Sequence, residues 1–257
     1  MYTTKLVFLG TGTSQGVPMI GCGCEVCKSH DSRDKRLRAS AYVEHNGLRF
    51  LVDAGPDFRQ QMLREGISSV DAILLTHNHK DHTGGLDDIR AFNYHEKKTV
   101  QIYCEKYVED SLKLEYSYAF AENKYPGAPD WQVNIIDDKP FSINDVEIIP
   151  IRGKHFRLPV LGYRFGNIAY CTDMNHIPEE EFSKLEGLEH FIINCVRKGR
   201  HISHFSLEEA IATAQKVGAE HTWLTHLSHQ LPKQEVLEKE LPAGIMPAYD
   251  GLVLFCD

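Results

Sequence analysis

Short apolar runs recur along the whole chain, and turn residues or polar loops separate them. Runs of four to eight apolar, β-branched and aromatic residues between turn signals are typical of strands. The dipeptide Asn46-Gly47 separates two of these runs and favours a tight β-hairpin turn. Strands are therefore predicted over residues 5–9, 41–44, 48–52, 72–75, 100–104, 133–136, 146–150, 161–165, 168–171, 191–194 and 222–225.

Fewer segments have the spacing of an amphipathic helix. The pattern predicts helices over residues 56–65, 86–94 and 207–217, and the run from Ser206 to Ala210 is typical of a capped helix start. No low-complexity linker divides the chain, and 257 residues with 42% hydrophobic composition can bury a large core. We therefore expect one domain over residues 1–257.

The stretch 105–131 has neither pattern. It is polar and aromatic-rich, and it contains Tyr125-Pro126-Gly127. Two interpretations are open for this stretch: a lid over a site, or a contact between subunits.

Composition narrows the class of protein. A formal net charge of −8 without a long Lys/Arg run gives no general attraction to polyphosphates, so nucleic acid is not an expected partner. No apolar run approaches the roughly 18 residues that a membrane helix needs, and residues 1–21 lack a secretory leader. We therefore expect a cytoplasmic protein without a membrane partner.

Seven cysteines, three of them within residues 22–27, favour reduced thiols and a metal site over a disulfide framework.

The sharpest chemical feature follows the predicted strand 72–75. Four candidate metal ligands lie there within six residues, namely His77, His79, Asp81 and His82. Imidazole and carboxylate groups suit divalent first-row metals, and their density here indicates two adjacent ions. The alternative is a polar surface loop that happens to be rich in histidine.

Two ions need more than four ligands, and the sequence offers three more at later strand ends. His155 comes after the strand 146–150, Asp173 ends the run 168–172, and His226 ends the run 222–225. Taken singly, each is equally well explained as a surface histidine or a strand-capping aspartate. Asp53 also ends a strand, where its carboxylate either orients a ligand histidine or forms a turn.

Together, the His-x-His-x-Asp-His run, the lone histidine, the aspartate after a strand and the final Thr-His resemble the metallo-β-lactamase superfamily, from Gly10 to Gly251. The resemblance implies an α+β fold, a four-layer αββα sandwich. It also implies the ligands of two catalytic metal ions: His77, His79 and His155 for one, Asp81, His82 and His226 for the other, and Asp173 as a bridge. Two ions that share a water molecule lower its pKa towards neutrality and make a hydroxide nucleophile.

Three further motifs resemble the phosphoribosyl cyclic phosphodiesterases of the PhnP type. They are the loop Gly10–Pro18, the cluster Cys22-Gly23-Cys24-Glu25-Val26-Cys27, and the ending from Thr225 to Gln230. This resemblance implies hydrolysis of a small cyclic phosphate on a phosphorylated sugar, with 5-phosphoribosyl 1,2-cyclic phosphate as the specific expectation. It also implies manganese at the catalytic pair, with zinc or iron as alternatives, a structural zinc, and a homodimer. The structural zinc would be held by Cys22, Cys24, Cys27 and His229, whereas the bottom-up alternative is three free thiols in a glycine-rich loop.

Two catalytic residues are predicted, Asp81 and His204. His204 matches a non-ligand catalytic histidine of the phosphodiesterase branch, and a proton donor is needed for the departing alkoxide. His201 is a rival for that role, and a plain position before the helix 207–217 is the structural alternative for His204. Arg197 and Arg200 are predicted substrate-binding residues, and the cations around His155 form a second candidate cluster.

Three other functions compete with this interpretation. A tRNA 3′-processing nuclease shares the metal signature, but we find no basic Gly/Pro-rich arm for tRNA. β-Lactam or thioester hydrolysis uses similar metal chemistry, and the fold alone would not exclude it. A metal-dependent sensor or binding module without turnover is the non-enzymatic alternative.

Overall fold

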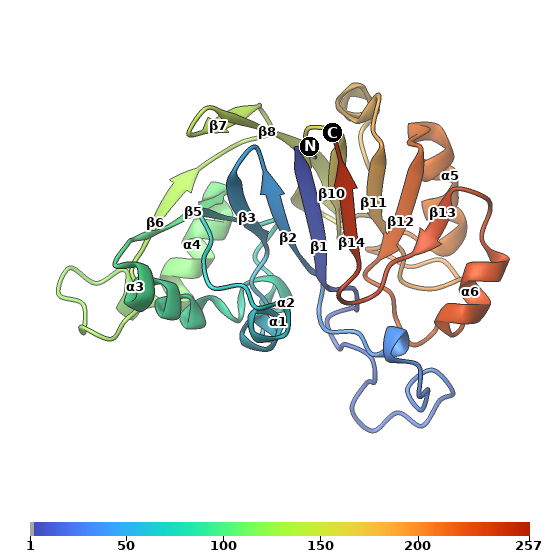
Figure 1. The fold of residues 1–257 in the computed structure, drawn as a ribbon, viewed down its shortest axis with the longest axis horizontal. Coiled ribbons are helices and arrows are strands. Elements are labelled where there is room, and N and C mark those ends of the chain that lie inside the picture. The colour runs from blue at the N-terminus through green and yellow to red at the C-terminus, as the bar shows by residue number, and fades with distance from the viewer. Residues whose placement is uncertain (1–2) are drawn as a thin grey trace.

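Two seven-stranded sheets form the centre of the molecule (Figure 1). The computed structural model describes residues 3–257; the first two residues, which the predicted domain 1–257 includes, lie outside the described residues. The first sheet has the order β14 (Val253–Cys256), β1 (Thr4–Gly10), β2 (Ser40–His45), β3 (Leu48–Val52), β4 (Ala72–Leu74), β5 (Val100–Cys104) and β6 (Trp131–Ile135). The second has the order β13 (Ile245–Pro247), β12 (His221–Thr225), β11 (His190–Asn194), β10 (Ile168–Cys171), β9 (Leu158–Phe165), β8 (Val146–His155) and β7 (Phe141–Ile143).

Helices cover the outer face of each sheet. The helices of the first half are α1 (Phe58–Glu65), α2 (Lys80–Thr83), α3 (Arg90–Glu96) and α4 (Lys106–Glu115), and those of the second half are α5 (Leu207–Val217) and α6 (Gln234–Glu240). Short 3₁₀ turns occupy Ser32–Asp34, Leu86–Ile89, Ser117–Ala119 and Glu179–Leu185. One apolar core lies between the sheets, where Phe50 and Phe165 pack with ring centroids 5.3 Å apart. Two further cores lie under the helices, so the four-layer αββα sandwich predicted from the sequence is confirmed.

Strand direction brings several chain segments to one edge of the sandwich. β3 and β4 are parallel, as are β10, β11 and β12. β8 is antiparallel to β9 and β9 to β10, so β8 and β10 run the same way. The carboxyl ends of these strands carry Asp53, His77, His155, Asp173 and His226. The topology therefore places the predicted ligands at strand ends that face the same direction.

Most predicted elements are present, and the differences concern their limits. The Asn46-Gly47 hairpin is confirmed, and both residues have positive φ, 49° and 83°. β8 continues five residues past the predicted end and reaches His155, because antiparallel pairing with β9 extends to His155 and Leu158. The predicted loop after β4 contains one helical turn, α2, and the predicted helix 86–94 is split into a 3₁₀ turn and α3.

The lid interpretation of residues 105–131 is wrong for the part that forms α4. Val108 and Leu112 of α4 are fully buried in the core under the first sheet. Tyr116 donates a hydrogen bond to the carbonyl oxygen of Thr83 at 2.8 Å, so the end of α4 is attached to α2. The sequence pattern missed this helix because only two of its ten residues are buried. The subunit-contact alternative stays a prediction.

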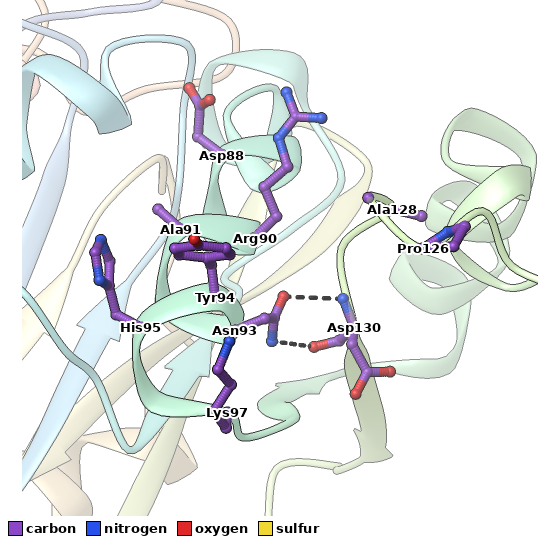
Figure 2. Close-up of a pocket in the computed structure, with 11 residues that line it drawn as sticks. Asp88, Arg90, Ala91, Asn93, Tyr94, His95, Lys97, Pro126, Ala128 and Asp130 are labelled. Carbon is purple, nitrogen blue, oxygen red and sulfur yellow. Dashed lines mark hydrogen bonds between the residues drawn. The ribbon is translucent and has the colours of Figure 1, made fainter.

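The loop before β6 is attached to α3. Figure 2 shows the surface pocket between them, of about 620 Å³, where Asn93 exchanges two hydrogen bonds with the backbone of Asp130, at 2.7 and 2.9 Å. None of the predicted metal ligands lines this pocket.

In the part of the chain that the structure describes, no helix has the length and apolar character needed to cross a membrane.

Candidate metal centre

Asp173 lies between two histidines at the edge where the strand ends meet. Its Oδ2 is 3.2 Å from Nε2 of His82, and its Oδ1 is 3.1 Å from Nε2 of His226. Asp81 Oδ2 is 3.3 Å from the same nitrogen of His82 and 4.0 Å from that of His226. Possible ligand atoms of all four residues lie within 4.8 Å of one another. Residues up to 145 positions apart in the chain, Asp81 and His226, thus belong to one compact group.

Three more predicted ligands pack beside this group. The rings of His77, His79 and His155 lie with centroids 4.6, 5.0 and 5.5 Å apart, and the His77 ring is 4.2 Å from that of His82. Nε2 of His77 and Nδ1 of His155 are buried without a hydrogen-bond partner. All seven residues that the sequence nominated are therefore brought to one place.

Asp53 holds His82 from behind the site. Its Oδ2 is 2.6 Å from Nδ1 of His82, and both oxygens accept hydrogen bonds from Thr76, at 2.8 Å from the backbone N–H and 2.8 Å from the hydroxyl. Because Nδ1 faces Asp53, Nε2 of His82 is the nitrogen turned towards Asp81 and Asp173. Of the two roles weighed for Asp53, the structure shows the orienting contact.

Histidine and carboxylate groups in the cluster shift one another's pKa values. Burial opposes the charge on both His82 and His226, but the carboxylate of Asp173 outweighs it, raising the pKa of His82 well above the usual value and that of His226 to about 9. Burial also opposes charge on Asp173, yet the neighbouring His226 and His82 hold the pKa of its carboxyl well below the usual value. The carboxylate of Asp173 and the rings of His82 and His226 therefore stabilise opposite charges on one another.

The donor set fits two divalent ions. Histidine nitrogens and carboxylate oxygens are hard-to-borderline ligands suited to divalent first-row metals. Buried nitrogens without hydrogen-bond partners are costly in a protein interior and require an explanation. Such nitrogens occur on four predicted ligands, His77, His82, His155 and His226, and also on His204 and Trp131. A pair of metal ions would satisfy one ring nitrogen on each of the four predicted ligands.

Three site residues have left-handed backbone conformations. Asp53, Asp173 and His226 have φ of 63°, 58° and 54°, in a region that residues other than glycine rarely occupy. Each lies just past the end of its strand, and the conformation turns the chain there. Strain of this kind persists where the surrounding structure over-determines it, and it is concentrated at functional sites.

His204 lies beside the cluster on the loop before α5. Its Nδ1 is 3.7 Å from Oδ1 of Asp173 and has no hydrogen-bond partner, and its ring stacks on His226 with centroids 4.6 Å apart. Its ligand atom also falls within 4.8 Å of those of His155 and Asp173. The structure therefore puts His204 within reach of both a catalytic role and a ligand role. His201, the rival, lies further out, with its ring 4.9 Å from that of His204.

The cysteine cluster forms a second candidate site. Sγ of Cys22 and Cys24 lie 3.3 and 3.5 Å from Nδ1 of His229, and Cys27 completes a group within 4.8 Å. Tetrahedral zinc with Zn–S near 2.3 Å and Zn–N near 2.0 Å has S···N separations of about 3.5 Å, so these four side chains fit it. A backbone hydrogen bond from Cys27, and then His229, lower the pKa of Cys24 to about 6, which favours the thiolate that binds metal.

The two predicted substrate-binding arginines line one pocket of about 660 Å³ beside His201. Arg197 is already occupied, because its guanidinium donates to the carbonyl oxygens of Gly199 and Arg200 at 3.1 and 2.6 Å. The Arg200 guanidinium has no hydrogen bond or ion pair with another described residue. Of the rival cations near His155, Arg152 is paired with Glu105 at 2.7 Å. Of the two predicted substrate-binding arginines, Arg200 is therefore the one left for a ligand.

Sequence reasoning missed the residues that hold the ligand loops. Asn194 is fully buried, and its side-chain amide bonds the backbone N–H and carbonyl of Met174 at 2.7 and 2.9 Å, next to Asp173. Thr172 donates to Asp173 Oδ2 at 2.8 Å. A signal was present, because a threonine precedes the ligand at three strand ends, as Thr76-His77, Thr172-Asp173 and Thr225-His226.

Comparison with known proteins gives the class. Residues 48–227 match the family described as a beta-lactamase superfamily domain. The chain belongs to the beta-lactamase superfamily and is a hydrolase of the metallo-β-lactamase fold, whose members bind divalent metal ions. This confirms the superfamily predicted from the sequence.

Within that class, the chain is similar to the PhnP family over nearly its whole length. A crystal structure described as a new diphosphatase from the PhnP family is 39% identical and has a TM-score of 0.91, covering 98% of this chain and 96% of that one. Zinc-bound PqqB from Methylobacterium extorquens, at 20% identity and a TM-score of 0.75 over 97% of this chain and 99% of that one, shares the fold.

A curated relative has a different name. An octanoyltransferase of Porphyromonas gingivalis is 43% identical over 256 residues, which make up 98% of this chain. The chain spans about half of that protein, 52% of its length. The name covers a protein that also contains a part this chain does not match.

Proposed function

We propose that the chain is a metal-dependent phosphodiesterase that hydrolyses a small cyclic phosphate ester, with 5-phosphoribosyl 1,2-cyclic phosphate as the specific candidate. The observation that carries the proposal is the position of His204, which lies against the Asp/His cluster and one ring contact, through His201, away from a pocket. A diphosphatase among the relatives also supports chemistry at phosphorus.

The seven clustered residues would hold two divalent ions, for which we propose manganese, with zinc or iron as alternatives. His77, His79 and His155 would bind one ion, Asp81, His82 and His226 the other, and Asp173, whose two oxygens face different histidines, both. When bound, such ions lower the pKa of a shared water and neutralise phosphate charge. The four residues of the cysteine cluster would hold a structural zinc.

Residues of the chain would position the metal ligands and supply a proton. Asp53 fixes the ring of His82, and Asn194 fixes the turn of Asp173. Burial, and then His226, lower the pKa of His204 to about 2 in the free protein, so its ring is neutral there. A bound phosphate anion would favour the protonated ring. His204 would then carry the proton that the departing oxygen needs.

The alternatives are less well supported. A nuclease acting on tRNA would need a basic surface for the phosphate backbone, whereas this chain has a net charge of −8. The name octanoyltransferase belongs to a protein of which this chain covers only about half. We propose a phosphorylated sugar as substrate, no nucleic-acid partner, and a homodimer.

The test is hydrolysis of 5-phosphoribosyl 1,2-cyclic phosphate and of bis(4-nitrophenyl) phosphate by the manganese-loaded protein. We expect turnover of both, and a fall in kcat of about 10²- to 10⁴-fold in His204→Ala, the usual contribution of a positioned acid. The metal content of His204→Ala should stay at the wild-type value, because loss of a general acid leaves the metal ions bound whereas loss of a ligand does not.

His95→Ala is the matched control, because His95 is an exposed histidine that lines the pocket between α3 and the loop before β6. It should keep full activity. Loss of one metal ion from His204→Ala would make His204 a ligand. Absence of turnover of both esters, with manganese, zinc or iron, would refute the phosphodiesterase.

A further inference from the structure

A threonine precedes a predicted metal ligand at three strand ends, and at two of them its hydroxyl bonds the side chain of that ligand. Thr76 Oγ1 lies 2.9 Å from Nδ1 of His77, and the Thr172 hydroxyl donates to Oδ2 of Asp173 at 2.8 Å. The Thr76 hydroxyl gives its single proton to Asp53 Oδ2, so Nδ1 of His77 is the donor in its pair. The bond therefore fixes the tautomer of His77 in which Nε2 keeps its lone pair for a metal ion.

The third pair, Thr225 and His226, lacks this bond. Both side chains are buried, and neither Oγ1 of Thr225 nor Nδ1 of His226 has a hydrogen-bond partner. Nε2 of His226 faces Asp173 at 3.1 Å, so Nδ1 is the nitrogen left for the threonine. The backbone permits such a bond, because φ is 54° at His226 and 58° at Asp173, where the threonine bond is formed.

Tyr170 adds another unpaired group behind the same ligand. Its side chain is fully buried between the sheets, and its hydroxyl has no hydrogen bond of good geometry. Burial raises the pKa of Tyr170 above its usual value, whereas the hydroxyl of Thr225 opposes this shift, so the two hydroxyls lie together. The charges of Asp53, His82 and Asp173 also act on the Tyr170 hydroxyl, which places it behind the candidate metal centre.

Tyr163 provides a contrast within the same core. It is also fully buried, but its hydroxyl donates to the carbonyl oxygen of Leu75 at 2.7 Å. A buried hydroxyl without a partner lowers stability, and a phenylalanine would fill the same space without that cost. Packing of the core therefore explains the ring of Tyr170 but not its hydroxyl.

We propose that Thr225 and Tyr170 are positioning residues that orient His226 for its metal ion. In the metal-bound protein, Nδ1–H of His226 donates to Oγ1 of Thr225, and the Tyr170 hydroxyl donates to the same oxygen, which has two lone pairs. The two hydroxyls thus do for His226 what Asp53 does for His82. The inference rests on the metal centre of the proposed function and is independent of the reaction at phosphorus.

The first test is titration of the metal-free protein with manganese, an ion that the cysteine cluster does not favour. Thr225→Val keeps the shape of the side chain and removes the hydroxyl. We expect its affinity for the ion that His226 binds to fall by about 10- to 100-fold, as for other partners of ligand histidines. The Tm of the metal-free variant should not fall, because the lost hydroxyl has no partner there. Thr222→Val, the same change at the other end of β12, is the control and should keep wild-type affinity.

Tyr170→Phe tests the second hydroxyl. It should raise the Tm of the metal-free protein by about 2–4 °C, because an unpaired buried hydroxyl is removed, and it should weaken manganese binding less than Thr225→Val does. Tyr163→Phe, which breaks the bond to Leu75, should lower Tm instead. Since Tyr170 acts through Thr225, the double variant should bind manganese with the affinity of Thr225→Val alone.

Proton NMR of the zinc-loaded protein observes the proposed bond itself. The Nδ1–H proton of His226, hydrogen-bonded and buried, should exchange slowly with water, and its signal should be absent from His226→Gln. In Thr225→Val the same proton should exchange faster. A threonine that only supports the fold would leave this exchange rate unchanged.

The outcomes separate this inference from the proposed function. Wild-type manganese affinity in Thr225→Val, or an unchanged exchange rate of the His226 proton, overturns the inference. Manganese affinity that depends on Thr225, in a protein that hydrolyses neither ester of the activity assay, would refute the phosphodiesterase and leave the inference standing. Failure of the wild-type cluster to bind manganese, zinc or iron would refute both.

Discussion

At the residue scale, the site depends on side chains that never reach the reacting atoms. Asp53 is fully buried, and its carboxylate makes three hydrogen bonds, two with the backbone N–H and hydroxyl of Thr76 and one with Nδ1 of His82. A carboxylate that accepts the second ring N–H of a ligand histidine fixes its tautomer and raises its basicity. The sequence allowed this role but could not distinguish it from a turn.

Asp53→Asn tests this contact. The amide keeps the size of the carboxylate but loses its charge. We therefore expect the affinity for the metal ion that His82 would bind to fall by about 10- to 100-fold. Metal titration of the metal-free protein measures it. Asp71→Asn, which weakens an ion pair with Arg49 on the same sheet, is the control and should keep wild-type affinity. Unchanged affinity in Asp53→Asn would show that Thr76 and packing alone orient His82.

At the element scale, helix starts and strand ends position the chemistry. α5 begins at a capping box, in which Glu209 accepts from the backbone N–H of Ser206 at 2.9 Å and donates its own N–H to the Ser206 hydroxyl at 3.4 Å. The loop that carries His204 ends at this cap. Local sequence patterns of this kind are readable, because a cap depends on residues three positions apart.

Ser206→Ala should lower the free energy of unfolding by about 1 kcal/mol, because the first turn of α5 loses its side-chain acceptor. Urea denaturation measures this change. Glu208→Ala, an exposed substitution in the same turn, should stay within about 0.5 kcal/mol of the wild type. If the two variants are equally stable, the capping box does not stabilise α5.

At the scale of the whole molecule, the cysteine cluster connects the loop after β1 to the loop after β12. Figure 1 shows the loop 11–39 extending from the end of β1, outside the sandwich. Its base is attached independently: Leu227 donates to the carbonyl of Thr11 at 2.8 Å, and the buried Arg36 bonds Gln234 at 2.6 Å. A zinc ion in the cluster would therefore order the tip of the loop rather than the core.

Cys24→Ser should accordingly lose one zinc ion and become sensitive to protease within residues 19–30, with little change in the urea midpoint of the core. Limited proteolysis with mapping of the cleavage sites, beside metal analysis, measures this. Glu25→Ser, an exposed change in the same loop, should behave as the wild type. Cooperative unfolding of the whole chain on zinc loss would contradict the separation of loop and core.

The sequence by itself determined the candidate ligand types, their positions at strand ends, the Asn46-Gly47 hairpin and the α5 cap. These follow from short-range patterns, since ligand chemistry, turns and hydrophobic periodicity are set by neighbouring residues. The αββα class was implied by the resemblance to a known superfamily. Only the tertiary structure decided which partners meet: that Asp53 faces His82, that Arg197 is consumed within its own loop while Arg200 stays free, and that Phe156 lines the pocket beside the centre. Those contacts join loops from both sheets, and their geometry depends on strand direction and sheet packing that no local window of sequence contains.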